Sequence, residues 1–131
     1  MANRTTDPAE QPRKAAEAIR AFNHVTYPAL NGRPGIEYTG TAYRAIGAFK
    51  SLAHRLPQSF DQIAMALAEL HKAGHLTADH STPTEHAAVT CAALREAEQH
   101  ATAMTKALER AHNASGALGY GGPIDDSDDD L

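Results

Sequence analysis

Residues 82–115 read TPTEHAAVTCAALREAEQHATAMTKALERAHNAS, and this stretch decides the fold. Seven of its positions recur at alternating steps of four and three residues, and six of the seven are apolar: Thr90, Leu94, Ala97, Ala101, Met104, Leu108 and Ala111. A mean spacing of about 3.5 residues keeps one stripe of a helix turned toward a neighbouring helix. A helix of roughly 33 residues would be about 50 Å long, so it requires a partner of the same length.

A capping box defines the start of this helix. Thr82 stands at the cap position, Pro83 at the first helical position and Glu85 three residues after the cap. In such a box the threonine hydroxyl accepts from the third backbone N–H, and the glutamate side chain reaches back to the N–H of the cap. The pattern predicts a helix over about 83–115.

The required partner lies upstream, in two helical patterns over about 41–56 and 57–74 that meet without turn residues between them. A proline inside a helix removes one hydrogen bond and clashes with the carbonyl four residues earlier, so Pro57 disturbs the carbonyl of Ala53. The segment is therefore either one rod kinked at Pro57 or two rods with a sharp corner. Because the joined patterns would span about 50 Å, the length that the last helix requires, we predict the kinked rod.

An N-terminal helix is predicted over about 11–24, where apolar residues repeat at helical spacing and Pro12 suits the first position. Asp7 followed by Glu10 offers an earlier capping box. That start would put Pro12 in the second turn, so the later start is favoured. Residues 26–39 carry Asn31-Gly32 and Pro34-Gly35 turn signals and are expected to form a loop.

These elements predict an all-α protein dominated by a long antiparallel hairpin, with residues 41–74 against residues 83–115. The N-terminal helix is expected to pack alongside, and dimerisation would complete a four-helix-type bundle. We expect a flexible N-terminus over 1–10, one helical domain over 11–118 and a disordered acidic tail over 119–131. The tail carries five aspartates: Asp125, Asp126, Asp128, Asp129 and Asp130. Such a block of like charge does not fold on itself.

Composition favours a cytoplasmic protein without a membrane span. The 131 residues contain one cysteine, Cys91, so an intramolecular disulfide is excluded. The sequence has no apolar run of the length that crosses a bilayer. The formal net charge is −4, with the first 56 residues basic and the remainder acidic.

The sequence offers little for catalysis or metal binding. His71 and His75 are four residues apart and would share a helix face, which makes them weak candidates for a zinc or nickel site. A specific site needs a third ligand, and Gly74 loosens the turn between the two histidines. Cys91 lies among alanines, where a small buried thiol is the usual explanation. We therefore expect no metal, no cofactor and no enzymatic activity.

Short motifs between Tyr43 and Leu118 resemble a group of small, uncharacterised all-α proteins of Streptomyces and related actinobacteria. The residues that carry the resemblance are Tyr43-x-x-Ile46-Gly47, Leu56-Pro57-Gln58, Leu67 through Gly74, and Ala114-x-x-Ala117-Leu118. Such proteins are often encoded by mobile or plasmid-like elements. The resemblance implies a host lineage and does not imply an activity.

The favoured function is assembly or adaptor binding through protein–protein contacts, with a homodimer or higher oligomer held along one seam. The expected interface residues are Leu94, Ala97, Ala101, Met104 and Leu108. The alternative is a DNA-associated accessory or regulatory protein whose acidic tail shields its basic half. That half carries the candidate phosphate contacts Arg13, Lys14, Arg20, Arg33, Arg44, Lys50 and Arg55.

Overall fold

The computed structural model describes residues 7–28 and 35–121, which form three α-helices and contain no strand. They are α1 (Glu10–Thr26), α2 (Thr39–Lys72) and α3 (Pro83–Ser115). The predicted all-α class is thus confirmed. The chain divides into two compact units, Met1–Tyr38 and Thr39–Leu131.

The first unit contains α1, which begins one residue earlier and ends two residues later than predicted. The Asp7 side chain accepts from the Ala9 N–H, and the Asp7 carbonyl accepts from the Glu10 N–H, so the chain already winds before the helix. Pro12 is the third residue of α1, where the missing N–H does little harm because the first four N–H groups have no partner within the helix. Packing of this helix on the hairpin stays a prediction.

The second unit contains one long helix where two were expected, because α2 runs unbroken through Pro57. The separate ranges 41–56 and 57–74 are therefore replaced by Thr39–Lys72, and the rod is favoured over the corner. Two extra bonds brace the backbone near the proline: the Arg55 guanidinium donates to the Ser51 carbonyl at 2.9 Å, and the Ser59 hydroxyl donates to the Arg55 carbonyl at 3.3 Å. A kink at Pro57 stays a prediction.

A tight turn ends α2 before the chain reverses. The His75 N–H bonds to the Leu70 carbonyl at 2.9 Å and the Gly74 N–H to the His71 carbonyl at 3.0 Å, which is a Schellman motif. It requires a left-handed residue, and Gly74 supplies it with φ of 78°. After the connection, the Thr82 hydroxyl accepts from the Glu85 N–H at 3.1 Å and α3 begins at Pro83, so the predicted range 83–115 is confirmed. The Glu85 carboxylate, expected at the cap backbone, instead accepts from the Ser81 hydroxyl.

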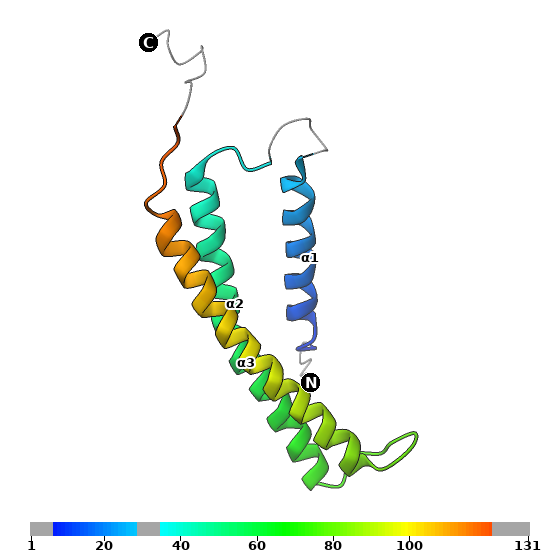
Figure 1. Cartoon of the computed structure of the whole chain (residues 1–131). Coiled ribbons are helices and arrows are strands. Elements are labelled where there is room, and N and C mark those ends of the chain that lie inside the picture. Colours follow the sequence, from blue (N-terminus) through cyan, green and yellow to red (C-terminus); the bar gives the residue numbers. More distant parts are fainter. Residues whose placement is uncertain (1–6, 29–34, 122–131) are drawn as a thin grey trace, which may run out of the picture. The chain divides into compact units, whose positions relative to one another are not determined.

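Helices α2 and α3 lie side by side as an antiparallel hairpin (Figure 1). Three cross-helix contacts fix the register: Tyr43 with His112, Ala64 with Cys91, and His71 with Thr84. In each pair the two residue numbers add up to 155. Because one pair precedes Pro57 and two follow it, the proline does not shift the register of the hairpin.

The most deeply buried side chains between the two helices are small. Among the described residues, the buried class contains three alanines: Ala53 at 0% exposure, Ala64 at 2% and Ala101 at 3%. Alanines let two backbones approach closely, but each buries little apolar area. The hairpin is therefore held by many shallow contacts along its length.

Candidate interaction surface

Polar side chains occupy alternate positions of α3 in the seam. Starting from Cys91 and stepping by seven, these positions are Cys91, Glu98, Thr105 and His112, and all four are half-buried. Each has a local partner: the Cys91 thiol lies 3.8 Å from the Ala64 carbonyl, Glu98 accepts from Arg95 at 2.9 Å, and Thr105 donates to the Ala101 carbonyl at 2.8 Å. The polar groups of these three side chains thus have partners within the hairpin.

The fourth polar position, His112, takes part in an aromatic stack at the end of the hairpin where α2 begins and α3 ends, here called the open end. The rings of Tyr43 and His112 lie 4.2 Å apart and nearly parallel, at 16°. Gly47 on α2 makes the space, because a Cβ there would lie 2.8 Å from His112 Nε2. Glycine destabilises a helix interior, and the close approach of α3 therefore explains why position 47 is a glycine.

The seam differs from the one expected from the sequence. Leu94, Ala101 and Leu108 face α2 within the same chain, but the partners that alternate with them are the four polar residues rather than Thr90, Ala97, Met104 and Ala111. Ala97 is half-buried and Met104 is 43% exposed beside the seam. The stripe that faces α2 within the chain therefore differs from the expected one by one helical position on one side, and an interface between copies along Leu94, Ala97, Ala101, Met104 and Leu108 stays a prediction. A pattern search for apolar residues misses polar residues whose partners lie within the hairpin.

The two borders of the seam have opposite chemistry. One border, here called the polar flank, directly follows the apolar seam positions such as Ala53, Ala101 and Leu108. It consists of Gly47, His54, Asp61 and Ala68 on α2 and Ala88, Arg95, Thr102 and Glu109 on α3. Arg95 bridges Asp61 and Glu98 across this flank. These two carboxylates raise the pKa of the exposed Arg95 guanidinium above its ordinary value through hydrogen bonds and charge.

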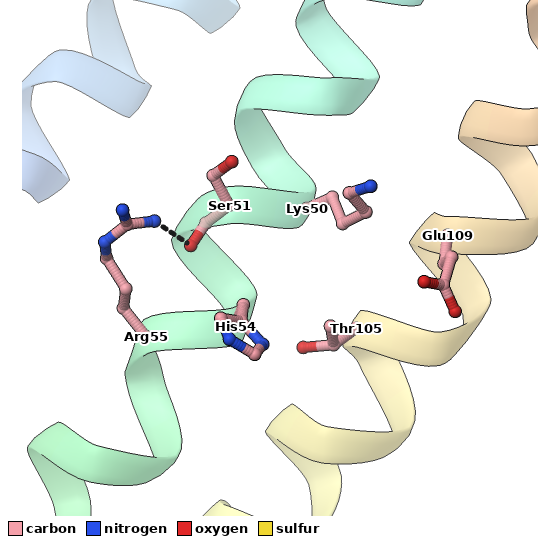
Figure 2. Close-up of a pocket in the computed structure, with 6 residues that line it drawn as sticks. All are labelled: Lys50, Ser51, His54, Arg55, Thr105 and Glu109. Atoms are coloured by element: carbon pink, nitrogen blue, oxygen red, sulfur yellow. Dashed lines mark hydrogen bonds between the residues drawn. The ribbon is translucent and has the colours of Figure 1, made fainter.

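A shallow hollow lies on the polar flank between α2 and α3. Its lining residues are Lys50, Ser51, His54, Arg55, Thr105 and Glu109. Figure 2 shows Lys50 and His54 directed toward α3, whereas Arg55 points away from it. The hollow is open and mixes cationic, hydroxyl and carboxylate groups, so it does not select one ligand charge.

The opposite border, here called the apolar flank, directly precedes the polar seam positions on α3 and the seam positions level with them on α2. Its members are Ala42, Phe49, Leu56, Ile63 and Leu70 on α2 and Thr90, Ala97, Met104 and Ala111 on α3. Ile63 is 49% exposed, Leu70 43% and Met104 43%. In an antiparallel pair of heptad helices, the positions preceding the seam on each helix lie on the same side. Ile63, Leu70 and Met104 are thus the large apolar side chains of this flank that the described residues leave exposed.

The histidine candidates do not converge. His75 lies beyond the Schellman turn, so it does not continue the helix face of His71, whose Nε2 lies 3.3 Å from the Thr84 hydroxyl. His86 Nε2 donates to the His80 carbonyl at 2.9 Å, and the two rings meet edge to face at 4.8 Å. Across residues 7–28 and 35–121, no three His, Cys, Asp or Glu side chains gather as metal ligands. Whether the protein binds metal stays a prediction.

The basic residues considered for DNA contact are split between the two units. Arg13 pairs with Glu10 and Arg20 with Glu17 on α1, and both partners are three residues earlier. The tail aspartates and Arg33 lie outside the described residues. Within the described part of the chain, none of the helices combines the length and apolarity that a bilayer crossing requires.

No protein-family model, curated protein or solved structure matches this chain. The function therefore has to be inferred from the two flanks of the hairpin.

Proposed function

We propose that this chain is a non-enzymatic helical assembly protein, and that its first partner is a second copy of itself. The observation that carries the proposal is the apolar flank, in which Ile63, Leu70 and Met104 are between 43% and 49% exposed. Full burial of an aliphatic side chain of this size contributes about 1.5–3 kcal/mol. Apolar stripes bordered by polar residues are typical of protein interaction sites.

Two apolar flanks pressed together would complete a four-helix bundle. The seam of one hairpin buries only alanines in the described part of the chain, so the larger apolar side chains on its border are the groups that gain most from a partner. A two-fold dimer uses the same stripe on both copies and needs no second binding surface. The proposal retains a bend in α2 at Pro57, because proline cannot donate to the Ala53 carbonyl.

Multi-angle light scattering over a range of micromolar concentrations tests the proposal. We expect the mass of a dimer, and a thermal midpoint that rises with protein concentration because association stabilises the folded form. A mass of one chain at every concentration, with a constant midpoint, would refute self-assembly.

The alternative function, a DNA-associated accessory protein, is distinguished by binding to duplex DNA at low salt. Phosphate contacts by Lys and Arg make affinity fall steeply as salt rises. Fluorescence anisotropy with the full chain and with a chain lacking residues 125–131 would detect both DNA binding and shielding by the tail. A salt-sensitive affinity that increases on truncation would favour this alternative over self-assembly as the main role.

A further inference from the structure

The open end of the hairpin holds an excess of positive charge. Residues 39–57 and 99–115, here called the basic end, carry one carboxylate, Glu109, against five Lys or Arg side chains: Arg44, Lys50, Arg55, Lys106 and Arg110. The formal charge of the basic end is therefore +4. The rest of the hairpin, residues 58–98, carries two Lys or Arg against six Asp or Glu. Within the hairpin, only the basic end is thus suited to an anionic partner.

The five cations of the basic end are not neutralised by the described part of the chain. None of them forms an ion pair there, whereas Arg95 of the acidic part pairs with two carboxylates. Arg44 donates instead to the uncharged Thr41 hydroxyl at 3.4 Å, and Arg55 donates to the Ser51 carbonyl at 2.9 Å. The positive charge of this end is therefore available to a partner.

The chain leaves α3 at this same end of the hairpin. The last residue of α3, Ser115, lies beside the beginning of α2 (Figure 1). Gly116 approaches α2 so closely that a Cβ there would lie 3.1 Å from Tyr43 Cε1. Leu118 lines a second shallow hollow together with Thr39 of α2. Residues 122–131 are therefore tethered to the basic end.

We propose that the five aspartates between residues 125 and 130 bind the basic end of the same chain. Residues 122–131 contain no Lys or Arg, so their side-chain charge of −5 opposes the +4 of the basic end. Single exposed ion pairs are weak, so several of them have to act together. The tether favours this, because a short flexible connection gives a local concentration in about the millimolar range.

The length of the connection fits this contact and no contact with the far end of the hairpin. From Leu118 to Asp130 the chain can extend over at most about 40 Å, at about 3.3 Å per residue. By the register of 155, Ser115 is level with residue 40 of α2. Arg55 is about 22 Å from that level and Lys72 about 48 Å, at 1.5 Å per residue of helix. The aspartates thus reach every cation of the basic end, but they do not reach Lys72.

The cations favour the side of the polar flank. Arg44 and Lys106 each lie three residues before a member of that flank, and Lys50 and Arg55 line its hollow. Bound aspartates therefore leave the apolar flank to a second copy, and the inference does not depend on self-assembly. Any other polyanion that uses this surface has to displace the aspartates first.

Paramagnetic relaxation enhancement tests the contact. A nitroxide label on Ser127→Cys, in a Cys91→Ala background, reports which backbone amides of the hairpin lie near the aspartates. The matched control is the same labelled chain with all five aspartates changed to asparagine, which keeps the tether and removes the charge. At low salt we expect stronger enhancement around Lys50 and Lys106 for the acidic chain than for the control. The difference should vanish at about 1 M salt, where the screening length is about 3 Å.

Charge reversals locate the contact on the hairpin. Arg44→Glu and Lys106→Glu, both at exposed positions, should each lower the charge-dependent enhancement about two- to fivefold, as expected for the loss of one exposed ion pair. Lys72→Glu is the matched control, because Lys72 is exposed on the same face of α2 as Arg44 but 28 residues further along. It should leave the enhancement unchanged.

Two results would overturn the inference. Equal enhancement for the aspartate and asparagine chains at low salt would show that the tether alone places the label there. A second sample mixes isotope-labelled chains without nitroxide with nitroxide-labelled chains without isotope. Enhancement in that sample as strong as in the first would show that the aspartates bind a second copy and not their own hairpin.

Discussion

The two flanks of the hairpin have the same helices, the same register and the same length, but opposite chemistry. On the polar flank, Arg95 forms ion pairs with Asp61 of α2 and with Glu98 of its own helix. The apolar flank leaves Ile63, Leu70 and Met104 between 43% and 49% exposed. A heptad pattern therefore determines which residues lie between the two helices of one chain. The residues that border this seam determine whether burial against a further partner is favourable.

The largest expected effect is on the free energy of unfolding, for a substitution inside the seam that holds α2 and α3 together. Ala101→Glu would bury a charge without a partner where the native side chain is 3% exposed. We expect a loss of about 3–5 kcal/mol in the free energy of unfolding. Ala103→Glu, two residues further on an exposed part of α3, is the matched control. Urea denaturation followed by circular dichroism compares the two, and equal stability would refute the seam.

A smaller effect is expected at the aromatic stack. Gly47→Ala should gain little or lose stability, since the added Cβ lies 2.8 Å from His112 Nε2. In a His112→Ala background the same change should stabilise by about 1 kcal/mol, the ordinary preference of a helix for alanine over glycine. A double-mutant cycle in thermal denaturation measures the coupling. Additive effects would show that Gly47 is not needed for the approach of His112.

The smallest effect is expected on the polar flank. Arg95→Gln removes an ion pair whose Arg95 and Asp61 side chains are 53% and 38% exposed. Exposed pairs contribute about 0.2–1 kcal/mol and are weakened by salt. We therefore expect a loss at the lower end of that range, which disappears in concentrated salt. A loss of several kcal/mol in unfolding experiments would mean that the polar flank, rather than the alanine seam, holds the hairpin.

The sequence predicted the helices well because their signals are local. The Thr82 cap with Pro83, the Gly74 stop and the 4-3 spacing each act within a few residues, and α3 begins and ends where predicted. Whether the helix continues through Pro57 was harder to predict. A proline in a sequence indicates a helix boundary unless packing stabilises the helix on both sides of it. The structure resolves this with a single helix.

The seam was predicted only in part, for a physical reason. Leu94, Ala101 and Leu108 were correct as helix-facing positions, but the choice of their neighbours required knowledge of local hydrogen bonds. Thr105 can occupy the seam because its hydroxyl donates to the Ala101 carbonyl. Cys91 can do so beside the Ala64 carbonyl on the other helix. The first bond is possible in any helix, whereas the second depends on the register, which the sequence does not specify.

The central claim is that the apolar flank joins two copies, and light scattering of one matched pair of variants tests it most directly. Ile63→Lys and Met65→Lys alter neighbouring exposed residues of α2, with native exposures of 49% and 56%, but only Ile63 belongs to the apolar flank. We predict that Ile63→Lys has the mass of one chain and keeps its helicity, whereas Met65→Lys remains a dimer like the unchanged protein. If both variants remain dimers with equal affinity, the apolar flank is not the interface.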